Sequence, residues 1–302
     1  MLELAVGCLA GVTVFAYWWE TLRAPREARA TLRAAGTWSA IWLLIGLLPT
    51  ALFGLFGDSG QATSYAAVYL IERALSLDNV FVFVVLIAAF EIPVSEENRL
   101  VSRGSLFAFL VRAPAIVIGV ALFEALHPIS YALGLLLIVL AWQTARADPA
   151  RVHGPGRLLA ALQRRLPVSE HVERRWIVSR GGRRLLTPAL MCLIALVLAD
   201  LAFAADSIPA GLAISHEQLL LLSANLFALL GLRPLYYAIL IARARLRYMN
   251  QTIAILLALA GLKLLAKDIF EVGPVASLVA VSVIFTVGSA VSIYAARRDQ
   301  PA

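Results

Sequence analysis

Charged residues are scarce in this chain, and cysteine is scarcer still. Only 15% of its 302 residues are Asp, Glu, Lys or Arg, whereas 61% are hydrophobic. A soluble protein would be about 45–50% apolar, so the composition indicates a membrane protein. The two cysteines, Cys8 and Cys192, each lie in an apolar stretch without a second thiol nearby. They indicate nothing about the redox compartment, and we expect both to be small core residues.

Catalytic signatures are also missing from the hydrophobic segments. These segments contain no Ser-His pair, no HExxH motif and no phosphate-binding glycine loop. We therefore expect no enzymatic activity and no permanently bound cofactor.

Long apolar segments dominate the sequence. Runs of about 18 or more apolar residues are typical of transmembrane helices. The first run has no basic leader and no cleavage site of small residues, so we expect it to be retained. The pattern predicts an all-α membrane protein with about nine transmembrane helices, at residues 4–20, 38–56, 63–90, 104–125, 129–144, 187–214, 219–241, 252–265 and 273–295.

Basic residues are distributed unevenly between alternate loops. Of the 26 Lys and Arg residues, 21 lie on one side of the predicted membrane, and the opposite loops hold only Lys267. Because basic loops stay in the cytoplasm, we predict an outside N-terminus and a cytoplasmic C-terminus in a bacterial plasma membrane. The arginines suit contact with anionic lipid headgroups, and we expect no nucleic-acid partner.

Two three-helix units of opposite topology are predicted. The second helix of one unit reads LFAFLVRAP at 106–114, and its counterpart reads LFALLGLRP at 226–234. An odd number of helices per unit makes the copies antiparallel, as in many secondary transporters. The predicted organisation is two N-terminal helices at 1–62, a first repeat at 63–144, a basic cytoplasmic loop at 145–186, a second repeat at 187–266, and a last helix with its tail at 267–302. Within the loop we expect a short amphipathic helix at 157–162 and a turn at Gly181-Gly182.

Two acidic motifs inside hydrophobic segments bear most directly on function. Residues 72–79 read ERALSLDN, and residues 200–209 read DLAFAADSIP. A charge at the centre of a membrane helix costs roughly 2.5–3.5 kcal/mol in insertion free energy. Four carboxylates in two such helices are therefore expected to serve a function that offsets this cost. A polar pathway for a cation is the role that we predict.

The first motif places its polar side chains on one side of a helix. Glu72, Ser76 and Asn79 share a face of an ideal helix. Asp78 lies one residue away, at about 100° around the same helix. The first motif therefore offers carboxylate, hydroxyl and amide oxygens together.

The second motif combines carboxylates with a freed backbone carbonyl. Asp200 and Ser207 share a helix face, and Asp206 lies beside it. Pro209 has no N–H, so the carbonyl of Ala205 loses its helical partner. Membranes tolerate such a backbone where it lines a cavity or binds an ion.

Oxygen donors dominate this candidate ligand set. Carboxylate and carbonyl oxygens suit Mn²⁺, Ca²⁺ and Mg²⁺, whereas imidazole and thiolate suit Zn²⁺, Cu and Ni²⁺. All four histidines fall in loops or at helix ends. We predict that Mn²⁺ is transported, with Ca²⁺ and Mg²⁺ as the next choices, and that Asp78 and Asp206 are the primary ligands. The full predicted set is Glu72, Ser76, Asp78, Asn79, Asp200, Asp206 and Ser207.

Basic residues in the same segments leave a structural alternative open. Arg73, Arg112, Arg233 and Lys263 equal the four acids in number, and interhelical ion pairs could simply hold the bundle together. In a functional version of this idea, Arg112, Arg233 or Lys263 compensates the carboxylates until a cation displaces it.

These segments resemble the TerC family of integral membrane proteins. The resemblance rests on ERALSLDNVFVF, DLAFAADSIPA, SANLFALLGLRPLYY and GLK, and runs from about Ser64 to Lys267. It implies a member of the LysE-type exporter superfamily with manganese-efflux-like activity and an association with tellurite resistance. It also implies that the seven predicted ligands occupy the motif positions of the family.

Two positions depart from the pattern of the family. Val197 stands where many members have Glu, and Gln143 stands where the first repeat often ends in Lys. The loss of the carboxylate at Val197 bears on metal affinity, on metal choice and on coupling to protons, the driving ion that we expect. An alternative role for the chain is a non-transporting scaffold that recruits partners through the arginine-rich segment 146–184.

Overall fold

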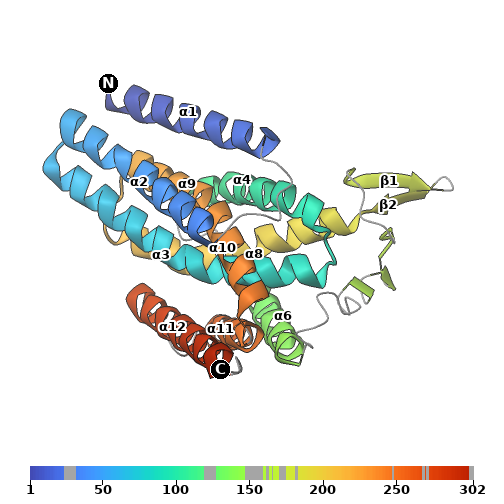
Figure 1. Ribbon diagram of the computed structural model, residues 1–302. Helices are drawn as coiled ribbons and strands as arrows, with labels where there is room; N and C mark the ends of the chain where they lie inside the picture. The colour runs from blue at the N-terminus through green and yellow to red at the C-terminus, as the bar shows by residue number, and fades with distance from the viewer. Residues whose placement is uncertain are drawn as a thin grey trace.

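The chain is almost wholly helical, as the sequence predicts (Figure 1). The computed structural model describes residues 1–23, 32–118, 127–146, 159–160, 163–164, 166–169, 175–180, 183–246, 248–266, 269 and 272–298. Its helices are α1 (Leu2–Arg23), α2 (Leu32–Phe56), α3 (Ser59–Ala89), α4 (Val94–Ile118), α6 (His127–Ala145), α8 (Pro188–Leu212), α9 (Gln218–Leu230), α10 (Leu232–Arg245), α11 (Met249–Leu265) and α12 (Pro274–Arg298).

Six segments of the described chain are long and apolar enough to cross a membrane. They are α1, α2, α4, α8, the pair α9–α10, and α12. The helices α6 and α11 are apolar but shorter. The described residues therefore agree with the predicted all-α membrane protein. The longest helix, α3, is not among the six, and it carries Glu72, Arg73 and Asp78.

The helix α3 lies at the centre of the bundle. It packs against α2, α8, α9 and α10, and α4 packs in turn against α8 and α9. The second half of α3 is buried on every side, with Val80, Phe83 and Leu86 fully enclosed. A helix that is surrounded in this way is apolar all round, which explains the continuous hydrophobic run after the first acidic motif.

The helices α6 and α11 cross at two glycines. A Cβ atom at Gly261 would lie 2.8 Å from the carbonyl oxygen of Gly134, and a Cβ at Gly134 would lie 3.0 Å from that of Gly261. Larger side chains would force the two backbones apart. Both glycines are therefore required by close helix packing, of the kind that small residues permit in membranes.

The predicted single helix at 219–241 is wrong in one respect, because the span is broken into α9 and α10 at Gly231. Pro234 cannot donate to the carbonyl of Leu230, which removes a helical hydrogen bond at the break. The guanidinium of Arg73 also approaches closely, since a Cβ at Gly231 would lie 2.8 Å from its Cζ atom. The group that crowds Gly231 is the Arg73 side chain of α3, a neighbour that the sequence of the 219–241 segment cannot reveal.

A β-hairpin precedes α8 and was not predicted. Its strands β1 (Ile177–Arg180) and β2 (Arg183–Leu186) pair antiparallel, with Arg180 opposite Arg183. This pairing agrees with the predicted turn at 181–182, although those two residues lie outside the described chain. Of the predicted helix at 157–162, only 159–160 are described, and they are helical.

The hairpin is attached to the rest of the molecule through Trp176. The guanidinium carbons of Arg99 and Arg103 lie 5.3 Å and 5.1 Å from its ring centroids. Cation–π contacts of this kind contribute about 0.5–1 kcal/mol each at exposed sites. They fix the hairpin over the first turns of α4.

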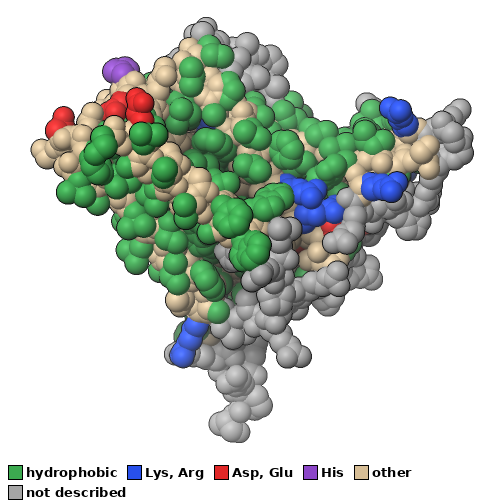
Figure 2. Space-filling model, turned by 90° about the horizontal axis from the view of Figure 1, so that it is seen from above, with side chains coloured by type: hydrophobic (Ala, Val, Ile, Leu, Met, Phe, Trp, Pro, Cys, Tyr) green, Lys and Arg blue, Asp and Glu red, His purple; other side chains and the backbone are tan. Residues whose placement is uncertain are grey.

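Charged side chains gather at opposite ends of the molecule. Figure 2 shows acidic side chains and a histidine at one end, and blue Lys and Arg side chains toward the other end, where the hairpin projects. The described residues thus carry the charge asymmetry that the sequence predicts. The outside N-terminus and cytoplasmic C-terminus remain predictions from that asymmetry.

Candidate functional site

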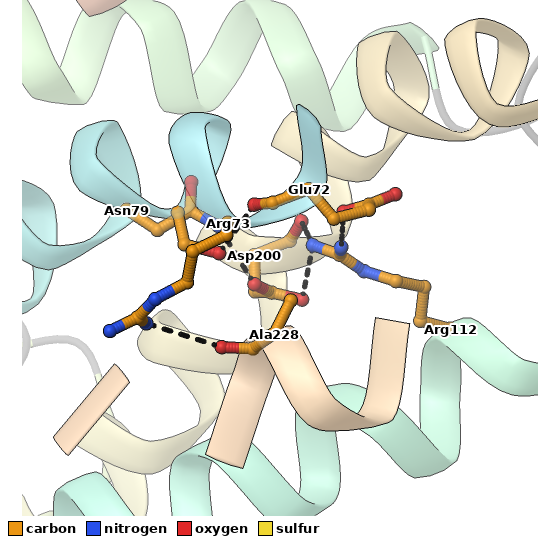
Figure 3. Close-up of polar contacts among 7 residues, drawn as sticks. Glu72, Arg73, Asn79, Arg112, Asp200 and Ala228 are labelled. Atoms are coloured by element: carbon orange, nitrogen blue, oxygen red, sulfur yellow. Dashed lines mark hydrogen bonds and ion pairs between the residues drawn. The ribbon is translucent and has the colours of Figure 1, made fainter. Parts of the chain in front are cut away.

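Arg112 joins the two acidic motifs in the interior of the bundle (Figure 3). Its Nη1 lies 3.2 Å from Oε2 of Glu72, and its Nη2 lies 2.8 Å from Oδ2 of Asp200. The same Nη2 donates to the backbone carbonyl of Asp200 at 3.1 Å. The guanidinium therefore forms two ion pairs at once.

The three side chains come from three different helices. Glu72 belongs to α3, Arg112 to α4 and Asp200 to α8. All three are buried, and Asp200 is completely enclosed. Buried charges require partners, and removal of one partner leaves the others uncompensated at high cost. The apolar surroundings therefore hold this triad together as a unit.

The two motifs also contact each other in a reciprocal way. Nδ2 of Asn79, seven residues after Glu72, donates to Oδ1 of Asp200 at 3.0 Å. Ser207, seven residues after Asp200, lies beside the Glu72 carboxylate. Both pairs fit the same antiparallel register between α3 and α8. The acid of each motif thus meets the neutral polar residue of the other.

Several buried polar atoms around the triad have no hydrogen-bond partner among the described residues. They include Oδ1 of Asn79, Oγ of Ser207, Nε of Arg112 and both side-chain polar atoms of Asn225. Asn225 of α9 is almost fully buried and also lies beside Glu72. Unsatisfied buried polar groups are rare in proteins and call for an explanation, such as an ion or water that completes their contacts.

The net charge of the triad would allow a metal ion to replace the Arg112 guanidinium between the two carboxylates. Two carboxylates and one guanidinium leave a net charge of −1. Without the guanidinium, Glu72 and Asp200 together carry −2, which matches one divalent cation. Such an ion would find carboxylate, hydroxyl and amide oxygens within this cluster, the donors that Mn²⁺, Ca²⁺ and Mg²⁺ prefer.

Comparison with known proteins identifies the family. The model of the integral membrane protein TerC family matches residues 58–300. The chain belongs to the TerC family. The match begins after α2, so it includes every helix that contributes to the triad.

Relatives of this TerC-family chain are membrane proteins of bacteria. It is 33% identical over 275 residues to an uncharacterized membrane protein of Mycobacterium tuberculosis (strain CDC 1551 / Oshkosh), covering 89% of this chain and 68% of the relative. It is 31% identical over 269 residues to the "Putative membrane-bound redox modulator Alx" of Escherichia coli (strain K12), covering 85% and 84%. A protein of the same name from Photorhabdus laumondii is 30% identical over 279 residues, covering 87% of each chain. No solved structure matches.

Among the remaining predicted ligands of this TerC-family protein, the structure describes the side chain of Ser76 but not those of Asp78 and Asp206. The hydroxyl of Ser76 donates to the backbone carbonyl of Glu72 at 2.7 Å, within its own helix. The side chains of Asp78 and Asp206, the predicted primary ligands, lie outside the described part of the chain, although their backbones belong to α3 and α8. Among the described residues, no group of three or more His, Cys, Asp and Glu side chains is arranged to hold a metal.

The predicted compensating bases also differ in what the structure shows. Arg112 forms ion pairs with both Glu72 and Asp200. Arg233 is buried at the start of α10 beside Tyr237, and Lys263 lies in the last turn of α11. Their compensating role remains a prediction.

Arg73 lies on the opposite side of α3 from Arg112 (Figure 3). It is buried, and it donates to the carbonyl of Ala228 at 3.4 Å and to Oγ of Ser39 at 3.3 Å. Ala228 belongs to the last turn of α9, where the helix dipole favours a positive charge. The TerC-family motif residue next to Glu72 thus stabilises the end of α9 instead of binding the acids.

Proposed function

We propose that this protein is an integral membrane exporter of divalent metal cations, with Mn²⁺ as the preferred substrate. The observation that carries the proposal is the Arg112 bridge between Glu72 and Asp200. A guanidinium held between two carboxylates occupies the position that a cation between the same carboxylates would take. The membership of the TerC family and the apolar helices agree with a transporter.

Metal binding would proceed by exchange with Arg112. An incoming divalent ion takes the two carboxylates, and the guanidinium moves away from them. The buried oxygens of Asn79, Ser207 and Asn225, which lack partners among the described residues, then complete the coordination. Asp78 and Asp206 would add two further carboxylates, as the sequence predicts.

The architecture that we propose has nine spans and two inverted repeats. Adding α3, α6 and α11 to the six long apolar segments gives the nine spans. Two reciprocal features support the repeats, namely the crossed contacts of the acidic motifs and the pairing of Gly134 in α6 with Gly261 in α11. Inverted repeats of this kind place the substrate near the middle of the membrane.

The export proposal is tested in cells loaded with manganese. Cells that express the wild type should retain less manganese than cells without it, and Asp200→Asn should remove the whole difference because the triad loses one carboxylate. Total cell manganese, measured at equal protein level, gives the result. The matched control is Glu96→Gln, which makes the same kind of change on α4 at a partly exposed pair with Arg99. Full export by Asp200→Asn would contradict the proposed site.

We propose that protons move in exchange for the metal. When the ion leaves and Arg112 returns, the triad carries a net charge of −1, and a proton on Glu72 or Asp200 would neutralise it. In inside-out vesicles, an imposed pH gradient should then drive Mn²⁺ accumulation, and a proton uncoupler should abolish it. Accumulation that ignores both treatments would remove proton coupling and leave the metal site untouched.

The name of the Alx relatives describes redox modulation, but the two cysteines of this chain do not form a pair that could carry out thiol redox chemistry. The chain has two cysteines. Both are free thiols, and Cys192 is buried in α8 as expected, but the expectation is wrong for Cys8, which is exposed on α1. Metal export is the function that the described residues support better.

A further inference from the structure

A second buried carboxylate lies in α4, outside the triad. Glu97 stands in the first turn of α4 and is 7% exposed. Tyr236 of α10 contacts it, and Tyr237 and Cys192 lie within its electrostatic reach. Three helices therefore enclose this acid at the end of the bundle where α4, α8 and α11 begin.

The phenol of Tyr236 is the notable neighbour. Its side chain is completely buried, and its hydroxyl completes no hydrogen bond among the described residues although it lies next to the Glu97 carboxylate. A buried hydroxyl without a partner is unfavourable, unless another group completes its contacts. The hydroxyl and the carboxylate together offer oxygen atoms to a third participant.

An arginine of α10 also interacts with this acid through its charge. Arg243 of α10 lies within electrostatic reach of Glu97, and its Nε donates to Oδ1 of Asn250 at 2.8 Å. The start of α4 therefore resembles the triad in composition. Each place combines a buried carboxylate, a guanidinium and a neutral oxygen that has no hydrogen-bond partner among the described residues.

One face of α4 connects the two places. Glu97, Val101, Ser105, Ala108 and Arg112 follow at intervals of three or four residues, and all are buried. This spacing places them in one row along the helix. The row spans about 22 Å at 1.5 Å per residue, and only short side chains lie between its charged ends.

We propose that Glu97 and Tyr236 form a second binding position for a divalent cation, at the end of α4 that the basic loops place in the cytoplasm. The ion binds there before it moves along α4 to Glu72 and Asp200. This inference rests on the proposed export function, and it adds to it the site where the substrate is first captured.

The test counts Mn²⁺ ions bound to the purified full-length protein by equilibrium dialysis. Wild type should bind ions at two positions. Glu97→Gln and Asp200→Asn should each lose one position and keep the other. The matched control is Glu96→Gln, the adjacent acid on α4, which should bind as wild type does.

Transport in inside-out vesicles separates capture from passage through the membrane. Glu97→Gln should raise the KM for Mn²⁺ about tenfold, with the maximal rate within about twofold of wild type. Tyr236→Phe removes only a hydroxyl and keeps the charge, and it should raise the KM in the same direction by about threefold. If Glu97→Gln fails to fold, this second variant decides the question.

The outcomes distinguish this inference from the proposed function. Wild-type stoichiometry and KM in both Glu97→Gln and Tyr236→Phe would overturn the second position, while loss of binding in Asp200→Asn would still uphold the deep site. A wild-type protein that binds no Mn²⁺ would overturn both proposals together.

Discussion

Replacement of Arg112 by alanine should destabilise the metal-free protein by about 3–5 kcal/mol. The variant leaves Glu72 and Asp200 buried without the cation that both now share. Added Mn²⁺ should reverse much of this loss, because the ion meets two uncompensated carboxylates and no longer has to displace a guanidinium. A ligand at one hundred times its dissociation constant adds about 2.7 kcal/mol. Thermal unfolding in detergent, with and without Mn²⁺, measures both effects.

The control for this experiment is Arg33→Ala, which removes an exposed arginine near the start of α2. Its unfolding temperature should stay close to that of wild type, with or without Mn²⁺. If Arg112→Ala unfolded at the wild-type temperature and gained nothing extra from Mn²⁺, the exchange between arginine and metal would be refuted.

Removal of all three charges should separate stability from transport. The triple variant Glu72→Gln, Arg112→Met, Asp200→Asn leaves no buried charge in the triad. Replacement of a buried ion cluster by neutral or apolar residues is often neutral, or stabilising by about 1–4 kcal/mol. We therefore expect a protein that unfolds at or above the wild-type temperature and that exports no manganese. Unfolding temperature and cell manganese content are measured on the same preparation of cells.

This result also separates export from a scaffold role. A scaffold that recruits partners through the segment 146–184 would keep its function in the triple variant, because its fold and its loop are intact. A stable variant without export would show that the charges serve transport. A stable variant that still lowers cell manganese would show that the triad only holds the bundle together.

The sequence was sufficient to predict the helical membrane fold and the meeting of the two acidic motifs. Carboxylates in apolar helices must find partners in the interior, so two such motifs are expected to converge. The choice among Arg112, Arg233 and Lys263 was not predictable, since all three lie in apolar segments. That choice depends on how α4 packs against α8 and α9 and so brings Arg112 to Glu72 and Asp200, which is a tertiary property.

Other features were missed for identifiable reasons. Glu97 was assigned to a loop, because α4 begins ten residues earlier than the apolar run suggests. Asn225 is a single amide in an apolar helix. It is visible in the sequence, but the sequence does not show that its side chain lies beside Glu72. The hairpin strands β1 and β2 are only four residues each, too short for a periodicity to emerge.

The antiparallel register of α3 and α8 links the two halves of the site mechanically. Asn79 lies level with Asp200, and Glu72 lies level with Ser207. If α3 slides along its axis against α8, both contacts break in the same step. The two motifs are therefore coupled, because a single displacement of one helix changes the surroundings of both Glu72 and Asp200.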